Sequence, residues 1–319
     1  MPCPHLQQLT NNRLKLPSMK NLRYLMLIML AGTMLTACND DDKIAEAAPP
    51  SAAGGPSDTN TNANYTNEDT AFGNYECPAI QVGDNFVRLI RRTSSYGITY
   101  MIEYDKSKRS QRWTCFQMNN TNSVKNWARK NWEGTTWGGD PFQPDPDLPT
   151  SARTELEDYR GSGYQRGHIC ASEDRVMSQA ANEQTFYLSN IMPQLGSLNT
   201  GVWGDMEIFL RNTWNNRNFR DVLYIVKGGT IRDDQIREIQ NNRLVVPKYF
   251  YMAVVCERGT QYKGLAFWAE HDKGSAAIRD CIISIDELES RTGIDFFCNL
   301  PDNIENAIEA KTTLGEWGL

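Results

Sequence analysis

Three blocks of sequence decide the fold and chemistry of this chain: EDYRGSGYQRGH (157–168), FYLSNIMPQ (186–194) and NTGVWGDME (199–207). In the first block Arg166 and His168 are two positions apart, so on a strand their side chains would face the same side. A lone histidine is usually structural. A cation beside a neutral imidazole, however, is a poor choice for stability and suits a general base working next to a phosphate.

Residues 203–214 are predicted to form a helix, because apolar residues recur there at helical spacing: Met206, Phe209, Leu210 and Trp214. A helix that began near Asn199 would place Asn199 and Glu207 on one side, roughly 12 Å apart along the axis. Unless the helix begins later and Asn199 bends back, one direct metal ligand and one acting through water is the more natural arrangement. An amide oxygen and a carboxylate suit Mg²⁺ with several retained waters rather than zinc.

The flanking sequence predicts the fold class. Residues 98–104 and 113–118 are rich in β-branched and aromatic residues and are joined by a polar turn, so they are expected to form a hairpin. Ser284 is expected to cap a helix that starts at 285, with Glu287 three residues after the cap. Because strands and helices do not alternate strictly, we expect an α+β fold with a central, largely antiparallel sheet flanked by helices. Three further strands are expected at 222–226, 250–255 and 264–268.

The three blocks, in this order, resemble the DNA/RNA non-specific endonucleases, the Serratia nuclease-like ββα-metal (His-Me finger) family. The similarity runs over most of 98–310, and the triplet RGH alone would be weak evidence for it. It implies a ββα-metal active-site motif, a divalent metal, Mg²⁺ with Mn²⁺ as a substitute, and DNA and RNA as substrates. Further segments that carry the resemblance are FQPDPDLP (142–149), KGG (227–229), VPKYF (246–250), IDELESRTG (285–293) and LPD (300–302).

The resemblance implies a role for each residue of the motif. His168 matches the general base that activates the attacking water, and Arg166 matches an arginine that contacts phosphate. Asn199 matches the direct metal ligand, and Glu207 matches a catalytic carboxylate that acts on the metal through water. Asn190 matches an asparagine of the motif at the catalytic site. The sequence alone does not distinguish a catalytic role of this asparagine from a structural one.

Two further positions complete the expected site. The family motif usually reads DRGH, and this chain has Gln165 in place of the aspartate. Glutamine keeps an acceptor oxygen but loses the charge, so Gln165 is expected to hold the metal through water, with weaker affinity. Arg129 is the candidate for an upstream catalytic arginine that stabilises the transition state.

We therefore expect a Mg²⁺-dependent endonuclease that hydrolyses phosphodiester bonds of DNA and RNA. One alternative is a nucleic-acid-binding surface lipoprotein on the same fold, with Gln165 marking weakened catalysis. Joint retention of His168, Asn199 and Glu207 argues against it. A third possible class is a surface lipoprotein that adheres to glycans. The export signal would fit it, but nothing in the three sequence blocks requires it.

The N-terminus is expected to be an export signal rather than part of the fold. Residues 1–38 contain basic Lys20 and Arg23, then a short apolar run at 25–31, and end in LTAC (35–38). The final residue of this segment resembles the lipidated cysteine of a bacterial lipobox, so Cys38 is the expected lipidation site. Met19 is the expected start, because it directly precedes the basic part of the signal. A plain signal with an incidental cysteine is the alternative.

Residues 39–72 are expected to form a flexible acidic linker, because they are rich in Ala, Gly, Pro, Ser, Thr and Asn. The NDDD that opens it at 39–42 resembles a tag that exports lipoproteins to the cell surface, with a solvated linker start as the equal alternative. Residues 73–319 are the expected nuclease domain. The chain is thus expected to be anchored to the membrane by lipid, at the bacterial outer membrane or the cell surface. Its oligomeric state stays open.

Charge and cysteine content narrow these expectations. The formal charge of −6 divides into +4 over 1–38, −6 over 39–70 and −4 over 71–319, so the folded part is only mildly acidic and a nucleic-acid substrate is not excluded. Three of 319 residues are histidine, which leaves little room for a multi-histidine metal site. Six of the eight cysteines lie beyond Cys38, and an even number in an exported protein suggests disulfides, with buried thiols as the alternative.

Overall fold

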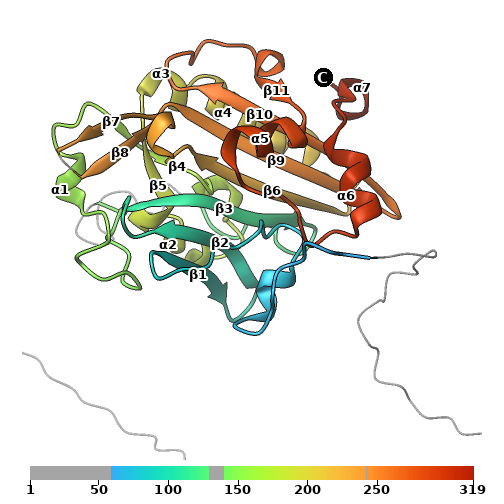
Figure 1. Ribbon diagram of the computed structural model, residues 1–319, viewed down its shortest axis with the longest axis horizontal. Coiled ribbons are helices and arrows are strands. Elements are labelled where there is room, and N and C mark those ends of the chain that lie inside the picture. Colours follow the sequence, from blue (N-terminus) through green and yellow to red (C-terminus); the bar gives the residue numbers. More distant parts are fainter. Residues whose placement is uncertain (1–58, 129–139, 242) are drawn as a thin grey trace, which may run out of the picture. The chain divides into compact units, whose positions relative to one another are not determined.

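The computed structural model describes residues 59–128, 140–241 and 243–319. A seven-stranded sheet forms its centre, and every neighbouring pair of strands is antiparallel (Figure 1). In sheet order the strands are β1 (Phe86–Thr93), β2 (Gly97–Asp105), β3 (Ser110–Asn119), β6 (Val222–Gly229), β9 (Tyr249–Arg258), β10 (Gln261–Glu270) and β11 (Ile282–Ile283).

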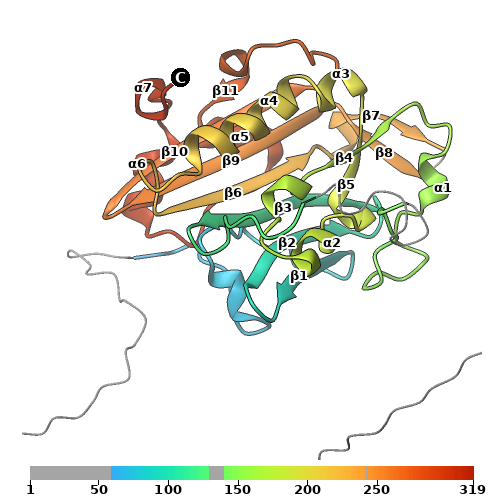
Figure 2. The same ribbon diagram turned by 180° about the vertical axis from the view of Figure 1, so that it is seen from behind.

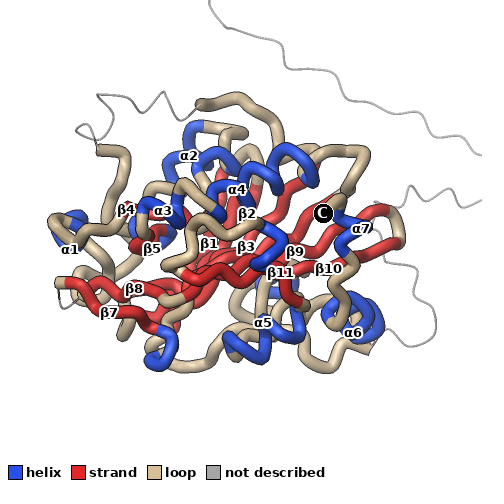
Figure 3. Tube along the Cα trace, turned by 90° about the horizontal axis from the view of Figure 1, so that it is seen from above, coloured by secondary structure: helices blue, strands red, loops and turns tan. Residues whose placement is uncertain are grey.

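Helices cover both faces of this sheet. Helix α4 (Val202–Phe209) lies on one face, and α5 (Ile285–Thr292) and α6 (Asp302–Glu309) lie on the other (Figures 2 and 3). The alternation of side chains along each strand explains the two layers, because Met252 packs in the core with α4 while its neighbour Ala253 packs in the core with α5. The expected α+β class with a central antiparallel sheet is confirmed.

Smaller elements complete the described part of the chain. Two short antiparallel pairs stand beside the main sheet: β4 (Gln165–His168) with β5 (Ile191–Gln194), and β7 (Ile236–Gln240) with β8 (Leu244–Pro247). The remaining helices are α1 (Leu156–Tyr159), α2 (Gln179–Gln184), α3 (Gly196–Asn199) and α7 (Leu314–Trp317). No helix among the described residues combines the length and the apolar character that a bilayer crossing requires.

The expected strands and the helix cap are present. The hairpin of 98–104 and 113–118 is β2 paired with β3, and Ser284 Oγ accepts a hydrogen bond from the Glu287 amide at 3.0 Å. The helix expected over 203–214 is present as α4, followed by a π-helical turn, Leu210–Trp214. A helix running back to Asn199 is not present, because the chain leaves helical geometry at Gly201 (φ −98°, ψ −130°). Asn199 instead ends the separate helix α3.

Two features of the body differ from expectation. Its packing begins before residue 73: Asn60 donates to the Leu300 carbonyl, and Phe72 is buried. Asparagine amides in this stretch bond to the body and so order a segment whose composition suggests a linker.

The expected disulfides are absent among the described residues, where all six cysteines are buried thiols. Five of them, all except Cys298, pack as small apolar side chains in the cores on both faces of the sheet. Burial raises the pKa of Cys170 to about 12, so this thiol stays protonated.

Candidate active site

The three sequence blocks form one ββα unit. Strand β4 comes from the first block and pairs with β5 from the second, so that Arg166 lies opposite Pro193 and His168 opposite Ile191. Helix α3 ends at Asn199, the first residue of the third block, and most of α4 comes from the rest of that block. Arg166 and His168 share one side of β4, since both contact Phe142: the Arg166 guanidinium lies 4.1 Å from the centre of the Phe142 ring, and the His168 ring centre lies 5.2 Å from it.

Aromatic rings surround the imidazole of His168. The fully buried Phe186 meets it edge to face, with ring centres 5.0 Å apart, and also packs against Phe142. Arg166 donates to Asp140 Oδ2 at 2.7 Å, and both of these side chains are partly exposed. His168 therefore sits against a rigid apolar wall, and its basic neighbour is held at the surface by an exposed carboxylate.

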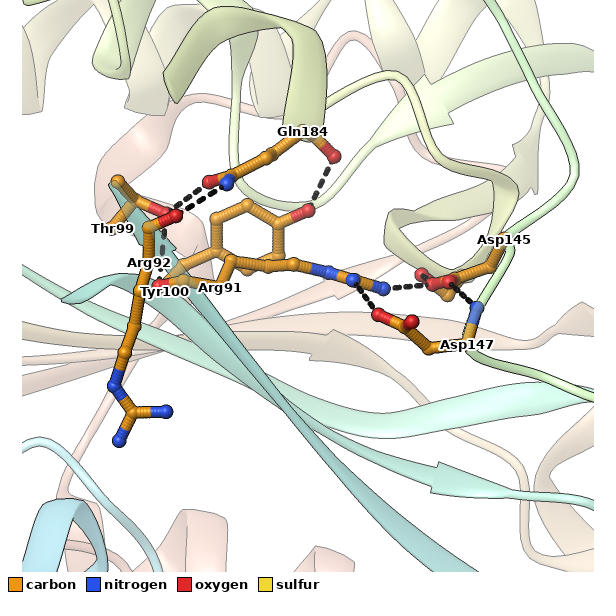
Figure 4. Close-up of polar contacts among 8 residues, drawn as sticks. Arg91, Arg92, Thr99, Tyr100, Asp145, Asp147 and Gln184 are labelled. Atoms are coloured by element: carbon orange, nitrogen blue, oxygen red, sulfur yellow. Dashed lines mark hydrogen bonds and ion pairs between the residues drawn. The ribbon is translucent and has the colours of Figure 1, made fainter. Parts of the chain in front are cut away.

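The loop that carries Phe142 is anchored by a buried ion pair. The side chain of Arg91 on β1 extends between Asp145 and Asp147 and pairs with both, as Figure 4 shows. Asp145 is fully buried and also accepts from Ser189, the residue before Asn190. The FQPDPDLP segment is thereby fixed on the sheet, so Asp145 supports the wall behind His168.

Asn190 lies inside the protein, with no exposed surface. Its Oδ1 accepts from the Cys170 amide at 2.9 Å, and its Nδ2 donates to the carbonyls of Cys170 and Thr185, both at 2.9 Å. All three bonds go to main chain, two of them to the residue two positions after His168. This geometry gives Asn190 a positioning role at the end of β4.

Gln165 and Asn199 are brought together directly. Asn199 Nδ2 donates to Gln165 Oε1 at 2.8 Å, which links the end of α3 to the start of β4. Gly196 lies against the same glutamine, because a Cβ there would come 3.0 Å from Gln165 Nε2. No described residue donates to Asn199 Oδ1, so this oxygen is available to a ligand.

His271 positions α3 from outside the three blocks. Its Nε2 accepts from the Leu195 amide at 2.8 Å, directly before α3, and its Nδ1 lies 2.7 Å from the Pro247 carbonyl. This pattern requires the neutral ring with its proton on Nδ1. Burial lowers the pKa of His271 below its ordinary value of 6.5, which keeps the ring neutral.

Glu207 lies in α4, above a buried lysine. Its Oε1 accepts from Lys227 on β6, whose side chain is only 1% exposed, and its Oε2 lies 4.0 Å from Arg211 one turn later. Arg211 in turn bonds the buried Asp174 at 2.9 Å. Burial raises the pKa of Glu207, and the charge of Lys227 opposes that rise.

These donors fit a hard divalent cation. The unbonded Oδ1 of Asn199 and the carboxylate of Glu207 offer oxygen only, and both side chains are partly exposed, which suits an ion that keeps several waters. Asn199 and Glu207 stand on different helices, α3 and α4, on either side of Gly201. Arg129 lies outside the described residues.

Sequence reasoning missed several residues of the site. Arg211 could have been found from its spacing, because it lies four residues after Glu207 on the same helix face. Lys227 lies in one of the segments that resemble the family, but neither its position nor that of His271 predicts a role at the site. Nothing in the sequence signals that Asp145 supports the wall behind His168 through Arg91.

Comparison with known proteins identifies the family and supports the fold. The family model described as DNA/RNA non-specific endonuclease matches residues 90–303. A nuclease of Nostoc sp. is 31% identical over 223 residues, covering 66% of this chain and 76% of that protein. Nuclease C1 of Cunninghamella echinulata is 28% identical, covering 67% of this chain and 86% of that protein. A chain from the crystal structure of the EndoG/EndoGI complex superposes with a TM-score of 0.57 at 23% identity, covering 70% of this chain and 91% of the other, which supports the fold.

The family match and the nuclease relatives, together with the ββα unit, place the chain among the metal-dependent endonucleases. The chain belongs to the DNA/RNA non-specific endonuclease family.

Proposed function

We propose that this protein hydrolyses phosphodiester bonds of both DNA and RNA in the presence of Mg²⁺, with His168 as the general base. The observation that carries the proposal is the grouping on one short strand: β4 presents Arg166 and His168 to the same aromatic wall, and its first residue, Gln165, holds Asn199. General bases, cations and oxygen donors are the groups that phosphodiester hydrolysis requires.

Each side chain has a defined part in this reaction. His168 removes a proton from the attacking water, which a neutral imidazole does efficiently near neutral pH. Arg166 exchanges its exposed partner Asp140 for a phosphate of the substrate and offsets the charge that develops there. Asn199 and Glu207 hold the metal, the latter through water, and Gln165 orients Asn199. A bound Mg²⁺ supplies further stabilisation of negative charge, and Mn²⁺ can replace it.

Recognition through phosphate and sugar alone accounts for the absence of base specificity. The test is digestion of plasmid DNA and of RNA by the purified protein, with Mg²⁺, with Mn²⁺ and with a chelator. Cleavage of both nucleic acids that the chelator stops supports the proposal. Binding of either nucleic acid without cleavage under all three conditions would instead favour the binding-protein alternative.

We further propose that the protein is exported and held at the outer membrane by a lipid on Cys38, with the residues that follow Cys38 as its tether. The basic, apolar and LTAC segments before Cys38 support this. Labelling with a radioactive fatty acid tests it: wild-type protein should incorporate the label and fractionate with membranes. Cys38→Ala should do neither, and equal labelling of both would contradict the anchor.

A further inference from the structure

Helices α5 and α6 bring together acidic side chains on the sheet face opposite α4, away from the ββα unit (Figure 3). One carboxylate oxygen from each of Asp286, Glu289 and Glu309 lies within 4.8 Å of the other two. We propose that these three residues form a calcium site, distinct from the catalytic metal site.

The state of Glu309 separates this cluster from an ordinary acidic surface. Its residue is only 6% exposed, and its Oε1 is buried without any hydrogen-bond partner among the described residues. A buried carboxylate without a partner is costly unless a cation or a donor compensates it. Because an oxygen of this carboxylate lies within 4.8 Å of an oxygen of each of the two further carboxylates, a cation is the ligand that fits.

The surroundings add negative charge and no compensating base. Asp295 and Glu305 flank the cluster, and both accept only from the amide of Asn62, at 3.2 Å and 2.9 Å. Within the described ranges, none of these five carboxylates has an ion pair with a lysine or arginine. Burial and then repulsion from Glu289, Glu305, Asp286 and Asp295 raise the pKa of Glu309 to about 10, as expected of a cluster that lacks its counter-ion.

The donor set favours calcium over magnesium. Calcium takes six to eight oxygen ligands in irregular geometry, whereas Mg²⁺ requires a near-ideal octahedron and retains its waters. Three carboxylates from two helices, one of them buried, supply several direct ligands. Glu289 still has an oxygen for the ion, since its Oε1 accepts the Phe296 amide at 2.7 Å.

The experiment compares the full-length wild type with Glu309→Gln and Asp286→Asn, with Glu287→Gln as a matched control on the same helix. Glu287 pairs with Arg291 and is not part of the cluster. Each protein is freed of metal with EDTA, dialysed and titrated with CaCl₂ by calorimetry, and its Tm is measured with EDTA, with Ca²⁺ and with Mg²⁺.

We expect wild type and Glu287→Gln each to bind one calcium ion more than either cluster variant. The Tm of wild type and of Glu287→Gln should rise by about 5 °C in Ca²⁺ and by less in Mg²⁺. In EDTA near neutral pH, Glu309→Gln should melt close to the wild-type Tm, because a carboxyl with a pKa of about 10 is already uncharged in the metal-free protein. Activity of both variants with Mg²⁺ on DNA should match wild type, which separates this site from the catalytic one. Equal calcium binding by wild type and both cluster variants, or a larger Tm gain in Mg²⁺ than in Ca²⁺, would overturn the proposal.

Discussion

Asn199 donates a hydrogen bond from Nδ2 to Oε1 of Gln165 across 2.8 Å, so the residue that departs from the usual family motif contacts the expected metal ligand directly. The neutral amide accepts the same hydrogen bond that a carboxylate would accept. This bond fixes the Asn199 carboxamide and leaves its Oδ1 available. The loss of charge at this position therefore does not by itself remove the Asn199 oxygen from the proposed metal site.

Gln165→Leu should raise the Mg²⁺ concentration for half-maximal cleavage by roughly 10-fold, because outer-shell hydrogen bonds that orient ligands contribute about that much to metal affinity. The rate at saturating Mg²⁺ should change less. The measurement is plasmid cleavage against Mg²⁺ concentration. Gln261→Leu, at the exposed start of β10, is the control and should behave as wild type. An unchanged Mg²⁺ requirement for Gln165→Leu would show that the bond to Asn199 has no such effect.

Lys227→Met should move the acidic limb of the pH–rate profile to higher pH. Lys227 opposes the burial that raises the pKa of Glu207, so removing its charge raises that pKa further, and the carboxylate is then lost at a higher pH as the solution is acidified. Cleavage rates from pH 5 to pH 9 measure the shift. Lys273→Met removes an exposed lysine and should leave the profile in place. A shift to lower pH would contradict the role given to Lys227.

Asp145→Asn should lower the free energy of unfolding by about 3 kcal/mol, because it leaves Arg91 buried with one charged partner fewer. Chemical denaturation measures this loss. The matched control is Glu68→Gln, which breaks the exposed pair with Arg88 and should cost under about 1 kcal/mol. Similar losses in the two variants would mean that the Arg91–Asp145 pair is not a structural anchor.

Stability should depend on His271 below neutral pH. Burial lowers its pKa in the folded state, so the folded protein resists protonation of this ring. The contribution is therefore complete above the ordinary pKa of 6.5 and is lost as the pH falls through the lowered value. The free energy of unfolding, taken from denaturation curves between pH 8 and pH 5, should fall more steeply with falling pH for wild type than for His271→Gln. Equal slopes of the free energy of unfolding against pH in the two proteins would show that His271 does not cause this pH dependence.

Much of the fold could be predicted because its signals are local. The strands β2, β3, β6, β9 and β10 are runs of β-branched and aromatic residues, and Ser284 caps α5 with the expected bond. The resemblance that the order of the three blocks carries also predicted the ββα unit. The strand and cap signals depend on residues close together in sequence.

The rest depends on contacts between distant residues. His271 reaches the start of α3 from 76 residues away, and Arg91 reaches Asp145 from 54. The break at Gly201 arises where the chain packs against Gly274, since a Cβ at Gly201 would come 2.2 Å from the Gly274 carbonyl oxygen. Cysteine count alone does not distinguish buried thiols from disulfides. Only the folded chain reveals these features.

His168 is the proposed general base, and the cleavage rate of His168→Ala is the decisive measurement of that role. With saturating Mg²⁺ and DNA, its rate should fall by about 10²- to 10⁴-fold, while its Tm and its affinity for uncleaved DNA stay near wild type. Added imidazole should restore part of the rate by entering the space against Phe142 and Phe186. Cleavage by His168→Ala within a few-fold of the wild-type rate would contradict the account.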